Sequence, residues 1–157
     1  MNTENNTSWI LAWTRVLKGK AGNDTVESME EIIIRTKKEK EILDITQEIQ
    51  KVVREKEVEE GMCHLFVEHT SAAITTADLD AGTDLDMLNA FEKMVPDLQY
   101  RHPHNPGHVK YHVLASLIGP SLSVPIDKGE LVLGAWQKIV FIELGGPKER
   151  TVMVRFS

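Results

Sequence analysis

Short runs of hydrophobic and β-branched residues, separated by charged or glycine-containing breaks, mark the elements of the first half of the chain. They predict strands over Glu31–Thr36 and Met62–Glu68, with Thr70–Thr76 as a further extended stretch. The charged segment Lys37–Glu41 is interpreted as a turn. Three strands are therefore expected in this half.

Helical periodicity appears twice between these breaks. The first predicted helix begins at a capping box formed by Asp44 and Gln47 and ends at Gly61. Its apolar stripe consists of Ile45, Ile49, Val52 and Val53. The second begins with Thr83 or Asp84 as its cap and ends at Pro96. Its inward-facing residues are predicted to be Leu85, Leu88, Phe91 and Val95.

The last third of the chain is dominated by extended segments. A loop is predicted over residues 97–109, which contain Pro103, Pro106 and Gly107. The strands predicted after it are Ser121–Ile126, Glu130–Leu133, Gln137–Leu144 and Arg150–Phe156. Because turn-forming glycines separate them, we expect an antiparallel meander. Grouped strands with a few helices indicate an α+β fold built on a mainly antiparallel sheet.

The N-terminal segment differs from the rest of the chain. Residues 1–28 are interpreted as an extension, and residues 29–157 as a single domain. Within the extension, helix-like spacing relates the apolar residues Trp9, Ile10, Leu11, Trp13 and Val16. This short helix is expected to pack on the body or on a neighbouring subunit.

Composition narrows the classes of partner. The chain has 157 residues and a formal net charge of −6, which argues against a nucleic-acid partner because phosphate binding needs a basic surface. The longest apolar runs, such as Ile139–Ile142, are far shorter than a membrane-spanning helix, so no membrane partner is expected. With one cysteine, Cys63, and no secretory signal, the sequence predicts a cytoplasmic protein.

Histidines form the most distinctive cluster of the sequence. They occupy positions 64, 69, 102, 104, 108 and 112, and four fall within eleven positions. An extended backbone would place His102 and His104 on one side, and a helix would place His108 and His112 on one face. His69 follows a predicted strand. Imidazoles that converge can bind a transition metal, so His69 with two or three of the loop histidines is a candidate metal set; ordinary solvent-exposed histidines are the alternative.

Longer motifs surround these histidines. They are Met62-Cys63-His64-Leu65-Phe66-Val67-Glu68-His69-Thr70-Ser71-Ala72-Ala73, Val95-Pro96-Asp97, Tyr100-Arg101-His102, His112-Val113-Leu114-Ala115-Ser116-Leu117-Ile118-Gly119-Pro120-Ser121, Gly134-Ala135-Trp136-Gln137, and Glu143, Gly146-Pro147 and Arg150. In order and spacing, they resemble the YjbQ-like family, whose members are often labelled secondary thiamine-phosphate synthases. The resemblance covers roughly residues 29–157.

The resemblance implies an α+β fold, a homotrimer and a metal site formed by His69, His102 and His112. The expected cofactor is a divalent metal, with zinc favoured by the imidazole ligands and magnesium or manganese as alternatives. The resemblance leaves His64, His104 and His108 without an assigned role. The chain departs from the family at Ala135, where threonine is common, and at Leu114, where lysine is frequent.

Other residues near these motifs are candidates for binding and catalysis. The expected catalytic residues are Glu143, Arg150 and Ser71, with Glu143 as a general base or as an acceptor that orients an imidazole. The expected substrate-binding residues are Thr70, Ser116, Trp136 and Gln137, around a small anionic substrate. As alternatives, the hydroxyl groups bond the backbone, Glu143 and Arg150 form a cross-strand pair, and Trp136 packs in the core or an interface.

Three hypotheses for the function follow from these candidate residues. The resemblance implies a synthase that joins hydroxymethylpyrimidine pyrophosphate to thiazole phosphate and releases pyrophosphate. A second hypothesis is a metal-dependent hydrolase of a small phosphorylated or acyl compound. A third is a trimer that binds a metabolite or metal without catalysis. Pyrophosphate displacement usually employs magnesium, whereas three histidines suit zinc, so the chemistry of the site does not choose among the three.

Overall fold

The computed structural model describes residues 29–96 and 98–157. Its elements in chain order are β1 (Glu30–Arg35), β2 (Glu41–Asp44), α1 (Thr46–Glu55), β3 (Glu60–Val67), β4 (Ala72–Ala77), α2 (Thr83–Met94), a 3₁₀ turn η1 (Pro106–His108), α3 (Val109–Ile118), β5 (Ser121–Asp127), β6 (Glu130–Leu131), β7 (Lys138–Glu143) and β8 (Glu149–Phe156). The predicted extension 1–28 lies outside the described residues. The α+β class is confirmed.

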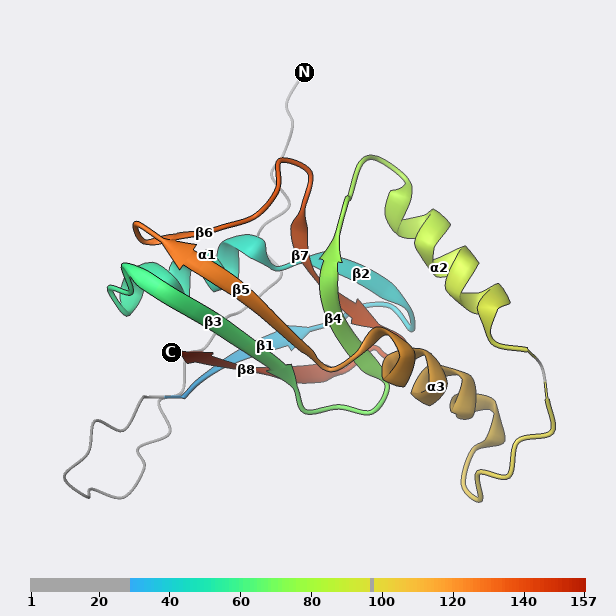
Figure 1. The fold of residues 1–157 in the computed structure, drawn as a ribbon. Helices are drawn as coiled ribbons and strands as arrows, with labels where there is room; N and C mark the ends of the chain where they lie inside the picture. The colour runs from blue at the N-terminus through green and yellow to red at the C-terminus, as the bar shows by residue number, and fades with distance from the viewer. Residues whose placement is uncertain (1–28, 97) are drawn as a thin grey trace, which may run out of the picture.

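Two antiparallel sheets form the body of the domain (Figure 1). One has five strands in the order β1-β8-β3-β5-β6, and the other has three in the order β2-β7-β4. The main core lies between the sheets, where Leu65 and Val152 of the larger sheet and Phe141 of the smaller belong to one buried cluster with α1. Burial of this apolar surface is the main force that holds the sheets together.

The smaller sheet is covered on both faces. Side chains alternate along β7, so Phe141 contributes to the core between the sheets and Ile142 to a second cluster with α2 and α3. Figure 1 shows these two helices on the side of the small sheet that faces away from the larger one. This layering explains why β7 is buried from Ile139 to Glu143.

Three predictions about the elements are wrong. The C-terminal strands do not form a meander, because β7 lies in the smaller sheet while β8 pairs with β1 and β3 in the larger. The charged turn is followed by an unpredicted strand, β2, which starts at the last residue of the turn, Glu41, and pairs with β7. The capping box is absent: Ile45 is the N-cap, and Asp44 instead accepts a hydrogen bond from the Thr46 amide at 2.9 Å.

The second helix also differs from its prediction. Leu88 and Phe91 are partly buried against the second core and Val95 is buried, as the periodicity indicates. Leu85, however, is 57% exposed. α2 therefore lies on the surface of the second core, with one narrow stripe of its residues partly buried. None of the described helices has the length and apolar character needed to cross a bilayer.

Candidate functional site

Three histidines from distant parts of the chain line one cleft of about 920 Å³. His69 comes from the connection between β3 and β4, His102 from the loop between α2 and α3, and His112 from α3. The described residues that line it are Phe66, Val67, Glu68, His69, Thr70, Ala72, His102, His112, Ala115, Ser116 and Pro120. The fold thus brings together the three histidines that the resemblance implied.

His112 has a fixed tautomer. Its Nδ1 lies 2.8 Å from the carbonyl oxygen of Thr70. A carbonyl oxygen only accepts hydrogen bonds, so Nδ1 must carry the proton and donate it. In the neutral ring, Nε2 therefore keeps an unshared electron pair. This nitrogen can accept a proton or coordinate a metal.

His69 has the opposite arrangement. Its Nε2 accepts a hydrogen bond of 2.9 Å from the backbone amide of Thr151. The proton of the neutral ring therefore resides on Nδ1. Burial, followed by the nearby Arg150 guanidinium, lowers the pKa of His69 from 6.5. His69 is thus held neutral, as a hydrogen-bond donor through Nδ1.

His102 stacks against His112, with ring centroids 5.5 Å apart and planes inclined by 15°. Its Nδ1 accepts long hydrogen bonds from the backbone amides of His104 and Asn105, at 3.3 and 3.4 Å. In this arrangement the proton of the neutral ring lies on Nε2. The His102 ring therefore packs against one face of the His112 ring.

A buried ion pair lies behind the histidines. Glu143 is fully buried and Arg150 is 4% exposed, and two guanidinium nitrogens lie 2.6 and 2.7 Å from the carboxylate oxygens. The carboxylate also accepts from the amides of Leu144 and Gly145. Arg150 donates to the Ser71 hydroxyl at 3.0 Å. None of the predicted catalytic residues Glu143, Arg150 and Ser71 lines the cleft.

The ion pair instead supports the backbone that holds the imidazoles. Ser71 directly follows Thr70, whose carbonyl accepts from His112. Arg150 directly precedes Thr151, whose amide donates to His69. Since Arg150 bonds Ser71 across these two segments, it links the backbone partners of both rings. Glu143 and Arg150 are positioning residues in this structure.

The predicted substrate-binding residues divide into two groups. Thr70 and Ser116 line the cleft, although the Ser116 hydroxyl donates to the His112 carbonyl at 2.8 Å. Trp136 and Gln137 lie outside it, in the connection from β6 to β7. There Gln137 accepts a hydrogen bond of 2.8 Å from the Gly134 amide, while Trp136 is 71% exposed.

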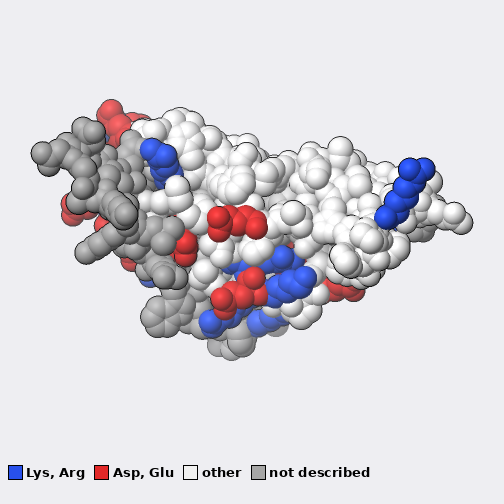
Figure 2. Space-filling model, turned by 90° about the horizontal axis from the view of Figure 1, so that it is seen from below, with Lys and Arg blue, Asp and Glu red and all other residues white. Residues whose placement is uncertain are grey.

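The cleft also contains residues that sequence analysis missed. Phe66 and Pro120 form apolar wall, and Glu68 adds a carboxylate. Phe66 is an outward-facing hydrophobic on a strand whose alternate residues are buried, and that alternation could have identified it. The described lining includes neither lysine nor arginine. Figure 2 shows one face of the molecule, on which the described acidic and basic residues lie close together near the lower centre of the view.

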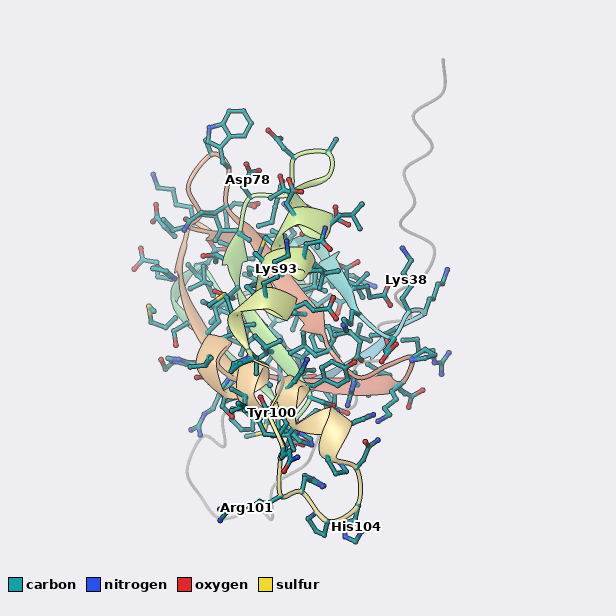
Figure 3. All side chains as sticks on the ribbon, turned by 90° about the vertical axis from the view of Figure 1, so that its right-hand side faces the viewer. Lys38, Asp78, Lys93, Tyr100, Arg101 and His104 are labelled. Atoms are coloured by element: carbon teal, nitrogen blue, oxygen red, sulfur yellow. The ribbon has the colours of Figure 1, made fainter. Side chains whose placement is uncertain are left out.

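The remaining histidines lie elsewhere. His64 bridges the hydroxyls of Ser123 and Ser157 on the larger sheet, 2.8 Å from each. His108 packs edge-on against Tyr111. Figure 3 shows His104 at the tip of the loop that connects α2 to α3, with Arg101 nearby and directed away from the sheets. None of the three lines the cleft.

A divalent metal fits this donor arrangement only in part. His112 offers a free nitrogen of the kind found in metal sites, because metal-bound imidazoles usually donate their other N–H to an acceptor. In His69 and His102 the unprotonated nitrogen already accepts from backbone amides. Over residues 29–96 and 98–157, no group of three or more histidine, cysteine or acidic side chains is arranged to hold a metal ion. As arranged, the rings do not fit three-imidazole coordination.

Comparison with known proteins identifies the family to which the chain is related. The sequence profile of the UPF0047 protein YjbQ-like family matches residues 30–157. The chain belongs to the YjbQ-like family. A UPF0047 protein of Archaeoglobus fulgidus is 35% identical over 126 residues, covering 80% of this chain and 98% of that protein. YugU of Bacillus subtilis is 33% identical over 123 residues, covering 78% and 93% respectively.

Solved structures agree with the YjbQ-like assignment. A YjbQ/UPF0047 protein from Clostridium acetobutylicum superposes with a TM-score of 0.76 at 36% identity and covers 81% of this chain and 98% of its own. A protein of unknown function from Sulfolobus solfataricus gives 0.76 at 29% identity, with 82% and 94% coverage. The recognised family is therefore confirmed, and the family is one of unknown function.

Proposed function

We propose that this YjbQ-like protein is a hydrolase of small, uncharged acyl compounds, and that two of the three histidines of the cleft, His69 and His112, carry the reaction. The observation that supports this most directly is the opposite tautomers of two rings in one cleft. His112 presents an unprotonated nitrogen and His69 presents an N–H. A base and a neutral donor in the same cleft are the two groups that acyl hydrolysis needs.

The proposed reaction begins with a water molecule at His112 Nε2. His112 accepts a proton from the water as its oxygen bonds the substrate carbonyl carbon. The carbonyl oxygen becomes an anion and accepts a hydrogen bond from His69 Nδ1. When the carbon–oxygen bond to the leaving group breaks, His112 returns the proton to that group. The products are a carboxylic acid and an alcohol.

The walls of the cleft suggest the shape of the substrate. Phe66, Ala115 and Pro120 offer apolar contact for its body, while Thr70 and Ser116 provide polar contacts. Glu68 would repel an anion, and no described lining residue is a lysine or arginine. An ester or lactone therefore suits the cleft better than a phosphorylated compound.

The synthase reaction expected from the resemblance fits the cleft less well, again because the described lining has no lysine or arginine. Its two substrates carry phosphate and pyrophosphate groups, which proteins usually bind with cationic side chains, helix N-termini or magnesium. Arg150, one of the expected catalytic residues, is buried and paired with Glu143. The small anionic substrate stays a prediction that would need a cation from outside the described lining.

A second candidate is a metal-dependent hydrolase in the same cleft. The bond from His112 Nδ1 to the Thr70 carbonyl favours it, because it leaves Nε2 available to a metal such as zinc. The metal would polarise an oxygen or acidify water. His69 and His102 would have to exchange their present backbone hydrogen bonds for coordination, which makes this candidate secondary.

Hydrolysis of an ester and lactone panel tests the proposal, with protein treated with a chelator and with protein loaded with zinc or manganese. We expect turnover without metal, and a loss of about 10²–10⁴-fold in His112→Ala, the usual contribution of a general base. His64→Gln is the matched control, because His64 lies outside the cleft.

Each outcome of these assays distinguishes between the candidate functions. Turnover that appears only after metal loading would support the second candidate over the first. Thermal stabilisation by ligands without turnover would support a non-catalytic binding protein. Pyrophosphate release from the two thiamine precursors would restore the synthase. Activity that survives in His112→Ala would contradict the proposed reaction.

A further inference from the structure

The connection between β6 and β7 presents an aromatic side chain on an ordered turn. The Gly134 carbonyl accepts a hydrogen bond of 2.9 Å from the Gln137 amide, and the Gly134 amide donates to the Gln137 side chain at 2.8 Å. Gln137 also donates to the Thr76 hydroxyl of β4 at 3.4 Å. Within this connection, Trp136 is 71% exposed and Val132 is 52% exposed. Because the turn is already ordered, burying the Trp136 ring against a partner costs little conformational entropy.

The histidine cleft lies at the other end of the smaller sheet. Ala72, the first residue of β4, lines the cleft, whereas Ala77 at the end of β4 lies opposite Lys138 of β7. The two alanines are five positions apart along the strand, which corresponds to about 17 Å. Figure 1 shows the connection from β6 to β7 at the top of the view, and α3 with the connection from β3 to β4 at the bottom. Trp136 therefore does not reach the cleft of its own chain.

The cleft offers the room and the apolar surface that an aromatic ring needs. Its volume of about 920 Å³ is near the upper end of the range of about 300–1,000 Å³ found for small-molecule sites. Phe66 is 48% exposed there, and Ala115 and Pro120 extend the apolar wall. Aromatic rings pack favourably against each other in offset or edge-to-face arrangements. An indole ring therefore fits beside Phe66 and leaves space for a small ligand.

The charges beside the two surfaces are complementary. Glu68 is the one carboxylate of the described cleft lining, and Lys138, two positions after Trp136, is exposed at the first position of β7. Within residues 29–96 and 98–157, neither Glu68 nor Lys138 forms an ion pair with another side chain. Opposite charges on two surfaces favour their encounter and fix their register.

We infer that Trp136 of a second copy of this chain inserts into the histidine cleft, with Lys138 of that copy beside Glu68. The cleft is then complete only in the assembly, and Trp136 contributes to a ligand site in a neighbouring chain instead of its own. The inference rests on the exposed ring, the apolar wall, the complementary charges and the distance between the two ends of β4. It concerns association, so it does not depend on which reaction the cleft performs.

Disulfide cross-linking of the full-length protein tests the contact. Trp136→Cys combined with Ser116→Cys places one thiol on the turn and one in the cleft. With copper phenanthroline as oxidant, we expect disulfide-linked dimers or trimers on a denaturing gel without reductant. Trp136→Cys combined with Ser123→Cys is the matched control, because Ser123 is also exposed but does not line the cleft. It should give less than about a tenth of the product, since a disulfide needs Cα atoms within about 7 Å. The native Cys63 is buried and does not compete.

An exchange of charges tests the same contact with Trp136 in place. Lys138→Glu sets two carboxylates against each other and should weaken association by about tenfold or more, as measured by light scattering over a dilution series. Adding Glu68→Lys re-forms the pair in the opposite order and should restore association to within about threefold. Lys128→Glu makes the same change of charge on the exposed turn between β5 and β6 and should leave association within about twofold.

The outcomes of the two tests are decisive for the inference. Cross-linked dimers and cross-linked trimers both support it, and the end product gives the symmetry of the assembly, a reciprocal pair or a head-to-tail ring. No cross-linking of the cysteines at positions 136 and 116, equal cross-linking in the control, or a charge exchange that fails to restore association would each overturn it. A wild-type protein that is monomeric at all concentrations would overturn it as well.

Discussion

At the scale of single residues, the protonation of the cleft is determined by backbone groups. Thr70 and Thr151 contribute a carbonyl and an amide, and each fixes one imidazole. The sequence could nominate His69, His102 and His112, but it could not predict their tautomers. The backbone partner of His112 lies 42 positions away and that of His69 lies 82 positions away, and only the fold brings them together.

The ion pair of Glu143 and Arg150 gives the first prediction. Glu143→Gln removes one charge and leaves the Arg150 guanidinium buried without its counterion, which should lower the free energy of unfolding by about 3–5 kcal/mol. Urea denaturation measures this loss. Glu149→Gln is the control: Glu149 also pairs with an arginine, Arg35, but both side chains are at least half exposed, so the cost should be at most about 1 kcal/mol. Equal costs for both variants would contradict the structural role of the buried pair.

His69 gives a second residue-scale prediction, on pH. Its pKa is lowered in the folded protein, by burial and by Arg150. The unfolded chain therefore binds this proton more readily, and the stability present above pH 6.5 is lost as the pH falls through the folded-state pKa. Between about pH 7.5 and pH 5, the wild type should lose more unfolding free energy than His69→Gln. Parallel denaturation curves at the two pH values test this, and identical losses would show that His69 does not titrate as described.

At the scale of elements, phenylalanine has a different place in each of the two sheets. Phe141 on β7 is fully buried between the sheets, whereas Phe66 on β3 is 48% exposed and forms a wall of the cleft. Phe141→Ala should cost about 3–5 kcal/mol of stability. Phe66→Ala should cost much less stability. If the cleft performs the proposed hydrolysis, it should instead raise KM for apolar acyl substrates, because the Phe66 ring would contact the body of the substrate. Denaturation and steady-state kinetics separate the two effects; a large stability loss in Phe66→Ala would place that residue in the core.

The elements themselves were largely predictable, and their assembly was not. Strand β3 and helix α1 follow from alternation and from a helical stripe that ends before Gly61. β2 escaped prediction because its four residues, Glu41–Asp44, include acids at both ends and pair with a strand about 100 positions away. The meander failed because adjacent glycine-containing turns do not reveal whether a chain reverses within one sheet or crosses to another. Here β6 and β7 lie in different sheets.

At the scale of the whole molecule, the single chain leaves large apolar side chains exposed. Trp136 is 71% exposed and Leu117 is 67% exposed, and Phe66 at the cleft adds a third. The first two lie in segments that resemble the motifs of the family, and exposed apolar surface of this kind is typical of interfaces. We therefore keep the homotrimer as a proposal. Size-exclusion chromatography with light scattering should give a mass three times that of the 17.7 kDa chain.

The trimer proposal can be tested further through Trp136. If this side chain packs against a neighbouring copy, Trp136→Ala should shift the protein towards smaller species at low concentration, since buried tryptophans contribute strongly to association. Its unfolding should also depend less on protein concentration, because association stabilises the folded chain by mass action. A wild-type protein that remains monomeric at all concentrations would contradict the proposal. A Trp136→Ala trimer as stable as the wild type would instead locate the interface elsewhere on the chain.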